Sequence, residues 1–255
     1  MDLVLTNCCD PLITVLTLNR PEKRNALNLA LMESLTVAIE SAARLPTCRA
    51  IILRSEGPAF CAGLDLHEAE AGDPAPSAKA LKRLYEAICL SPLVTVAAAQ
   101  GAAMGGGAGL VAACDLAIVS EDFQLAFPEV RRGLVAALVT CLIRRQIGDR
   151  TTRELILLGR TVAAEEAFSL TLVNRVTKSA ALLETAMQVG GEVCAGAPGA
   201  VARTKQLLDR LSPRPIAAEL EAALEFHLQA RHSPEAAEGI AAFKEKRDPK
   251  WPTRA

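Results

Sequence analysis

Aromatic side chains are scarce in this chain, and so is net charge. Phe, Tyr and Trp make up 3% of the 255 residues, which argues against a surface that stacks nucleobases or sugars. The formal net charge of -1 gives no electrostatic basis for binding nucleic acid or an anionic membrane. No uninterrupted apolar run suits a membrane span, and residues 1–4 do not resemble a secretory leader. We therefore expect a cytoplasmic enzyme or binding protein.

The eight cysteines lack the spacing of a metal site. No C-x-x-C pair occurs, and the three histidines do not stand at distances typical of zinc ligands. We expect reduced cysteines in the core and no metal. The eight are Cys8, Cys9, Cys48, Cys61, Cys89, Cys114, Cys141 and Cys194.

The first half of the chain predicts strands that alternate with helices. Residues 12–18 are rich in β-forming side chains and predict a strand paired with residues 3–6. Apolar positions at helical spacing over 29–45 predict an amphipathic helix, which a strand at 50–53 follows. Such alternation implies a mostly parallel α/β sheet. The remaining elements expected in this half are helices at 77–90 and 110–113 and strands at 93–99 and 116–119.

Beyond residue 150 the strand pattern is weak. One strand candidate lies near residues 172–176, and Ala, Leu, Glu and Arg then dominate between the prolines. We expect a helical C-terminal third. Ala-rich faces such as that of residues 217–228 are more often packing elements or subunit contacts than cofactor sites.

The most informative stretch is GAAMGGGAGL at residues 101–110, where three consecutive glycines separate an apolar strand candidate from an apolar helix candidate. Glycine is favoured where φ is positive or where another group approaches the backbone closely. We expect amides of this turn, at the electropositive start of a helix, to donate hydrogen bonds to a substrate oxygen. An NAD-binding turn is disfavoured, because the run lacks the last Gly or Ala of that fingerprint and does not follow the first strand.

Four motifs in order resemble the crotonase superfamily, also called the enoyl-CoA hydratase/isomerase family. LNRPEKRNAL at 18–27 resembles its N-terminal signature, and AFCAGLDL at 59–66 resembles its first substrate loop. The glycine run through Cys114 and Asp115 is similar to its second loop, and residues 233–239 with 242–247 are similar to its C-terminal motif. The resemblance spans nearly the whole chain, and four ordered motifs are far more specific than one.

The resemblance implies an α/β fold, with a crotonase-like spiral of ββα units over residues 1–195 and a C-terminal helical trimerisation region over 196–255. Family members bind acyl-CoA thioesters and form trimers or dimers of trimers, so it also implies an acyl-CoA partner and a homotrimer or hexamer. Two backbone amides stabilise an enolate-like intermediate, and here they belong to Leu64 and Gly106. Loss of one such donor typically costs about 2.7 to 4 kcal/mol. No metal or redox cofactor is implied, because coenzyme A is part of the substrate.

The carboxylates depart from the pattern of family hydratases, which commonly carry one glutamate just after the glycine run and another in a later Pro-Glu segment. The second matches Glu129, whereas Gly109 stands at the position of the first. Two carboxylates can hold a water between them, so a single one favours a proton shuttle. The resemblance therefore implies Glu129 as general acid/base, either in isomerisation of a 3-enoyl-CoA to its 2-enoyl isomer or in hydration by Glu129 alone.

The same resemblance assigns further contacts to the CoA thioester. Lys23 and Arg24 are expected near the CoA phosphates, and Phe243 and Lys246 at its adenine end. The other expected contacts are Ala26, Ala62, Gly63, Asp65, Leu66, Gly105 and Gly109.

Other polar residues are interpreted as structural rather than catalytic. Those of the first loop are taken as a solvated helix start, although His67 is also a candidate acid or base. They are Asp65, His67, Glu68 and Glu70; the remaining groups taken as structural or surface residues are Arg131, Arg132, His227 and His232.

Two other interpretations stay open. An acyl-CoA-binding pseudoenzyme would have lost turnover together with the acidic residue at position 109. Other crotonase reactions, including decarboxylation, thioester hydrolysis and ring cleavage, use the same anion hole with different side chains.

Overall fold

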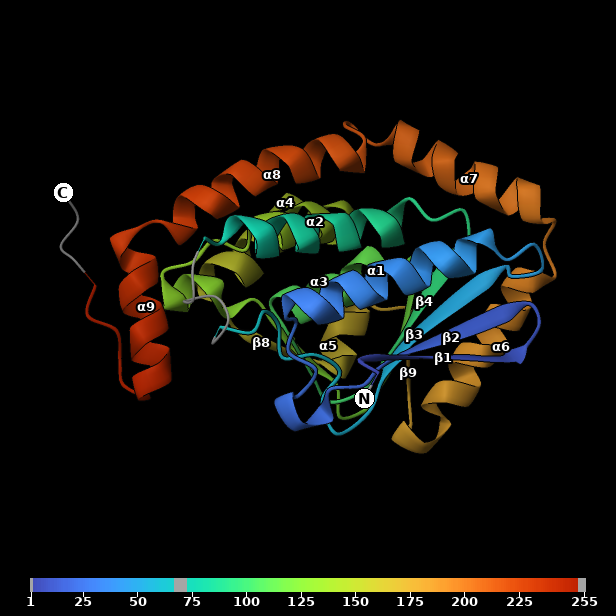
Figure 1. Cartoon of the computed structure of the whole chain (residues 1–255), viewed down its shortest axis with the longest axis horizontal. Coiled ribbons are helices and arrows are strands. Elements are labelled where there is room, and N and C mark those ends of the chain that lie inside the picture. The colour runs from blue at the N-terminus through green and yellow to red at the C-terminus, as the bar shows by residue number, and fades with distance from the viewer. Residues whose placement is uncertain (1, 67–72, 252–255) are drawn as a thin grey trace.

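A six-stranded sheet runs through the computed structural model, which describes residues 2–66 and 73–251 (Figure 1). The first two strands pair antiparallel and every later neighbour is parallel. The order in the sheet is β1 (Val4–Asp10), β2 (Ile13–Leu18), β3 (Ala50–Ser55), β4 (Val94–Ala99), β6 (Leu116–Ser120) and β9 (Arg175–Thr177). The predicted, mostly parallel α/β sheet is confirmed.

Helices cover both faces of this sheet, so its central strands are apolar on both sides. On one face, Leu16 and Leu53 belong to the same buried cluster as Leu35 of α1 (Leu29–Arg44). On the other face, Ile52 and Val96 share a cluster with residues of α6 (Leu182–Cys194). The next helix, α2 (Ala75–Cys89), packs against α1.

A second, three-stranded sheet positions the turns that form the site. It contains β5 (Ala102–Met104), β7 (Gln124–Ala126) and β8 (Thr161–Ala163), with β5 and β7 parallel. Because carboxyl ends of parallel strands meet at one edge of a sheet, the segments that follow β5 and β7 begin side by side. These segments are α3 (Gly106–Ala113) and the 3-10 helix η3 (Pro128–Arg132). The glycine run and the Pro-Glu segment are thereby brought together.

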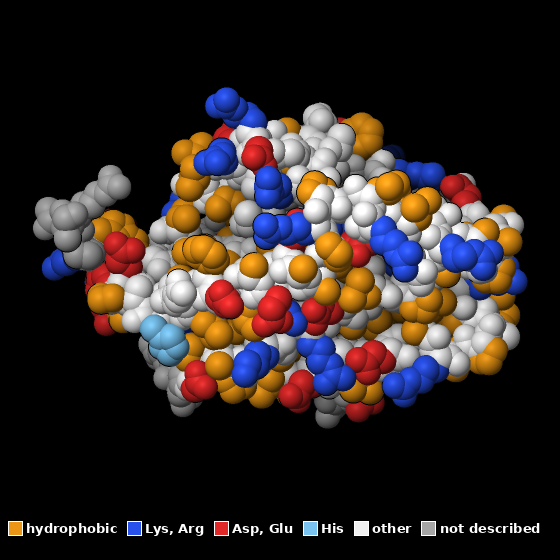
Figure 2. All heavy atoms as spheres, turned by 90° about the horizontal axis from the view of Figure 1, so that it is seen from above, with side chains coloured by type: hydrophobic (Ala, Val, Ile, Leu, Met, Phe, Trp, Pro, Cys, Tyr) orange, Lys and Arg blue, Asp and Glu red, His pale blue; other side chains and the backbone are white. Residues whose placement is uncertain are grey.

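The last third of the chain is helical, as expected. The helix α8 (Ile216–Arg231) packs on α2 and on α4 (Ala137–Leu158), and α9 (Pro234–Glu245) packs on η3 (Figure 1). The helix α7 (Pro198–Leu211) buries none of its residues, and Figure 2 shows apolar side chains among the charged ones on the face seen from above. No helix within the described ranges has the length and apolar content to cross a membrane. The remaining elements are α5 (Ala164–Ser169) and the 3-10 helices η1 (Pro21–Lys23) and η4 (Ser179–Ala181).

Three expectations need correction. The strand expected near residues 172–176 is present as β9 but begins at Arg175, because Leu172 and Val173 are buried outside the sheet. Helix α3 begins within the glycines, four residues before the expected start at Leu110. The cysteines whose side chains are described carry free thiols, but Cys8 is exposed rather than in the core.

Candidate active site

The first loop presents a backbone amide to a cavity through a single strand-like pairing. The amide of Leu27 donates to the carbonyl of Gly63 (2.8 Å), and the amide of Asp65 donates to the carbonyl of Leu27 (3.0 Å). Peptide groups alternate in direction along an extended segment, so the amide of Leu64 points away from Leu27. Within the described part of the chain, this amide donates no backbone hydrogen bond.

The glycine turn presents a second amide beside the first. Gly105 has φ 49° and ψ -115°, a conformation that favours glycine, and its own amide is held by the carbonyl of Ala126 (2.8 Å). Gly106 then begins α3, so its amide lies at the electropositive helix end. A Cβ at Gly63 would lie 3.6 Å from the nitrogen of Gly106, which shows how closely the two segments approach. Leu64 and Gly106 both line one cavity.

Glu129 places a buried carboxyl group on the same cavity. Pro128 starts η3, and the side chain of Glu129 lies against the glycine turn, where a Cβ at Gly105 would come within 2.6 Å of its Oε1. The Oε2 atom is buried and has no hydrogen-bond partner in the described chain. Burial raises the pKa of this carboxyl group to about 7, although Arg132 nearby favours the charged form. Such a group exchanges protons readily near neutral pH.

The cavity itself is narrow, with a volume of about 40 Å³. One water requires roughly 10–15 Å³ by this measure, so the cavity holds a few waters at most. Its wall is mainly apolar, and its other polar side chains are Arg132, His227 and Arg231. The lining residues are Ala62, Gly63, Leu64, Leu66, Leu81, Met104, Gly105, Gly106, Glu129, Arg132, Leu134, Val135, Ala136, Ala137, Leu138, Val139, His227 and Arg231.

Two close backbone contacts hold η3 against the C-terminal helix α9. A Cβ at Gly133 would lie 2.1 Å from the carbonyl oxygen of Glu235, and one at Gly239 would lie 2.1 Å from that of Arg132. The guanidinium of Arg132 also stacks on the ring of Phe243, 4.2 Å from its centroid. The glycine of the C-terminal motif therefore supports the segment that carries Glu129.

Comparison with known proteins agrees with this geometry. The family model described as enoyl-CoA hydratase/isomerase matches residues 11–254. The chain belongs to the enoyl-CoA hydratase/isomerase family. A Thermus thermophilus protein, provisionally named an enoyl-CoA hydratase, is 37% identical over 94% of this chain and 97% of its own length. The 2,3-dehydroadipyl-CoA hydratase of Escherichia coli is 29% identical over 95% of this chain and 96% of its own. A solved enoyl-CoA hydratase of Mycobacterium avium superposes with TM-score 0.88 at 30% identity, covering 99% and 100% of the two chains.

The structure brings only part of the expected enoyl-CoA hydratase/isomerase site to the cavity wall. Seven of the residues expected from the family resemblance line it: Ala62, Gly63, Leu64, Leu66, Gly105, Gly106 and Glu129. Lys23 and Arg24 are exposed beside the first loop, where the carbonyl of Arg24 accepts from the amide of Ala62 (2.9 Å). Ala26 is half-buried and Gly109 buried, and neither lines the cavity. Phe243 touches Arg132, and Lys246 is exposed at the end of α9.

The interpretation of polar groups as solvated surface residues is wrong for Asp65 and Arg132. Asp65 is not in a solvated helix start, because its carboxylate accepts from Arg20 (2.7 Å) and its side chain is 9% exposed. Arg132 and His227 line the cavity, whereas Arg131 and His232 are exposed, as expected. Burial and the charge of nearby Arg231 lower the pKa of His227 to about 4, so this imidazole is neutral at pH 7. Sequence periodicity carried no signal for His227, because it comes from the distant helix α8. Arg132 lies three residues after Glu129 in η3, and residues three apart in a 3-10 helix share a face, so the sequence did carry a local signal for its contact.

The candidate acid or base His67, with Glu68 and Glu70, lies outside the described residues. Among the described ones, no group of three or more His, Cys, Asp or Glu side chains suits a metal ion.

Proposed function

We propose that this chain acts on an enoyl-CoA thioester through an enolate-like intermediate, with Glu129 as the single general acid/base. One observation carries the proposal: Glu129 is the only carboxyl group on the described cavity wall, and it lies against the glycine turn that ends in the Gly106 amide. The amides of Leu64 and Gly106 are the two donors for the thioester oxygen. Neither φ nor crowding by protein atoms requires glycine at 106, since a Cβ there would approach no described atom closer than 3.4 Å. Close approach of a ligand is the remaining reason for this glycine.

Double-bond isomerisation is the reaction that one carboxylate performs most simply. Glu129 removes a proton from C2 of a 3-enoyl-CoA, and the electron pair moves onto the thioester oxygen, where two amides stabilise it. The protonated Glu129 then returns the proton to C4, the double bond moves to C2–C3, and the carboxylate is regenerated. The apolar wall supports this route, because burial keeps the pKa of Glu129 near neutral pH, at about 7.

Hydration by Glu129 alone is the second candidate. The cavity has room for a water, and the relatives include proteins named as hydratases. In this reaction Glu129 takes a proton from water as the oxygen bonds to C3, and then delivers a proton to C2. Both routes use the same enolate and the same donors.

The coenzyme A moiety provides the remaining contacts of the proposal. Lys23 and Arg24 are exposed beside the first loop and are suited to the phosphates, while Phe243 and Lys246 are suited to the adenine end. No metal or redox cofactor takes part. Loss of one of these contacts should raise the KM for the CoA thioester.

The deciding experiment follows proton transfer separately from turnover. The protein is incubated in deuterated water with a 3-enoyl-CoA and with a trans-2-enoyl-CoA, and double-bond migration, hydration and deuterium incorporation are measured. We expect Glu129→Gln to abolish all three while CoA-ester binding stays within about twofold, because the amides are untouched. The matched control is Glu184→Gln, an exposed carboxylate on α6 at the opposite face of the sheet.

The outcomes separate the alternatives. Full activity of Glu129→Gln would contradict the assignment of the base. Saturable binding without reaction or exchange in the wild type would identify a pseudoenzyme, and release of free CoA or CO₂ would indicate thioester hydrolysis or decarboxylation.

A further inference from the structure

Family hydratases carry their first glutamate at the position of Gly109. In this chain a residue of another helix fills the space that a side chain at 109 would take. Gly109 lies in the first turns of α3, and a Cβ built on it would lie 2.1 Å from the hydroxyl oxygen of Tyr85 and 2.6 Å from its Cζ. Real Cβ atoms do not approach other heavy atoms this closely. No side chain fits at 109 while Tyr85 keeps its place.

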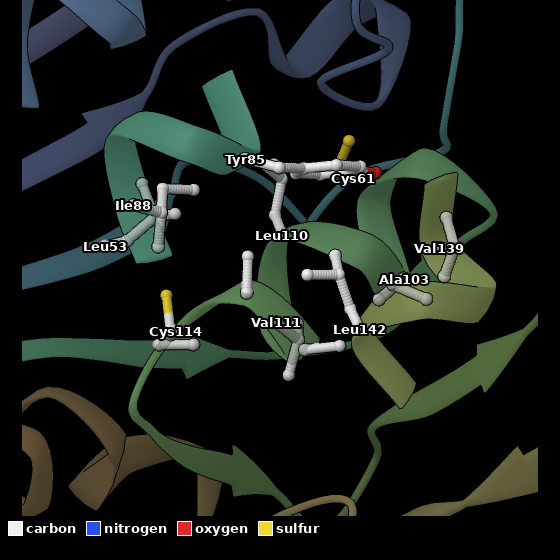
Figure 3. Packing of buried hydrophobic residues seen from close by; sticks show 14 of the residues in the cluster. Leu53, Cys61, Tyr85, Ile88, Ala103, Leu110, Val111, Cys114, Val139 and Leu142 are labelled. Carbon is white, nitrogen blue, oxygen red and sulfur yellow. The ribbon is translucent and has the colours of Figure 1, made fainter. Parts of the chain in front are cut away.

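Tyr85 is held firmly in that place. It comes from α2, is fully buried, and donates a hydrogen bond to the carbonyl of Gly106 (2.9 Å). Figure 3 shows its ring above Leu110 of α3, with the hydroxyl next to Cys61. Burial raises the pKa of the phenol well above its usual value, so the group stays neutral.

The hydroxyl of Tyr85 contacts the proposed oxyanion hole only through the carbonyl group of Gly106. Tyr85 is not among the residues that line the cavity. It holds Gly106 through the carbonyl, and Gly106 itself lines the cavity. Tyr85 is therefore a positioning residue.

We propose that Tyr85 determines the one-carboxylate character of this site: its phenol fills the space that a side chain at 109 would need, and its hydroxyl anchors Gly106. This inference rests on the proposed function, because it assumes that Glu129 moves the proton and that the Gly106 amide binds the thioester oxygen. It means that a glutamate cannot be restored at 109 by one substitution. The chemistry of the site depends on a residue of α2.

The occupied space is tested by a double-mutant cycle on stability. We expect Gly109→Ala to lower Tm by about 3 to 10 °C in the wild type, because the buried ring cannot move away. In a Tyr85→Leu background, which removes the ring end and the hydroxyl, the same substitution should lower Tm by less than about 2 °C. Equal losses in both backgrounds would overturn the steric half of the proposal.

The consequence for the reaction is tested with glutamate. We expect Gly109→Glu in the Tyr85→Leu background to raise the ratio of hydration to isomerisation at least about tenfold over Tyr85→Leu alone, since a second carboxylate then stands at the position where family hydratases carry their first glutamate. A folded double variant with an unchanged ratio would contradict the inference.

The anchoring half is tested with Tyr85→Phe, which keeps the ring and removes only the hydrogen bond. We expect kcat to fall about fivefold with KM unchanged. The control Ile88→Val, another buried residue of α2, should change Tm without changing kcat. Wild-type kcat in Tyr85→Phe would overturn this half. If the wild type itself shows no turnover or exchange, the proposed function fails instead, and the stability cycle still decides whether Tyr85 fills the space.

Discussion

The buried carboxyl group of Glu129 makes a prediction about stability that does not depend on the substrate. Its pKa is about 7 in the folded protein, against 4.5 for an unperturbed glutamate side chain, because burial disfavours the charged form. A folded-state pKa raised in this way favours folding below pH 4.5, and this contribution is lost as the pH rises to about 7. The separation of the two pKa values corresponds to about 3 kcal/mol.

Replacing Glu129 by Gln removes the ionisation and keeps the shape of the side chain. Burying the uncharged side-chain amide has a cost that does not depend on pH, so it changes the free energy of unfolding of the variant by the same amount at every pH. We therefore expect the stability of Glu129→Gln relative to the wild type to increase by about 3 kcal/mol between pH 4.5 and pH 8 and to be level above that range. For a chain of this length, this corresponds to a relative gain in Tm of about 6 to 12 °C.

The assay is thermal unfolding of both proteins at equal concentration across pH 4.5 to 9. Parallel curves of Tm against pH would refute the reasoning, because they would show that Glu129 ionises as easily in the folded chain as in the unfolded one. Glu184→Gln serves as the control, since its side chain is exposed. In the active enzyme, kcat/KM should rise with pH through about 7 as the base loses its proton.

Two further predictions concern the C-terminal helices. Gly239→Ala should lower stability by about 1 to 3 kcal/mol and reduce kcat, because a Cβ there meets the backbone of Arg132 and displaces the segment that carries Glu129. The matched control is Gly191→Ala, at an exposed helical glycine where a Cβ would meet nothing within 4 Å. This control should stabilise the protein by about 0.5 to 1 kcal/mol in thermal unfolding. Equal losses of stability in both variants would contradict the packing argument. The second prediction is that the chain forms a homotrimer or a dimer of trimers, as measured by light scattering. Leu211→Glu should weaken the assembly, because this leucine of α7 is 73% exposed in the single chain. A monomer at micromolar concentration would contradict the prediction.

Long elements with clear periodicity could be predicted from the sequence. The β-forming residues around Leu16 and the helical spacing of α1 correspond to the structure. All six residues of β2 are buried between two layers of helices, which favours apolar and β-branched side chains, and burial of one face of α1 imposes the helical period. The strands β5, β7 and β8 have three residues each, which is too short for a period to be visible. The sequence therefore did not predict these strands, and without them it could not show that the glycine run and Glu129 lie side by side.

The amino-acid sequence by itself determined the family, through four ordered motifs, and with it the glycine turn, the first loop and Glu129. It also showed that position 109 carries no carboxylate. The tertiary structure alone decided what stands there instead, because Tyr85 is 24 residues away and belongs to another helix. It likewise brought His227 to the cavity and buried Glu129. Contacts between elements set burial and the space around a residue, and neither quantity can be read from local spacing.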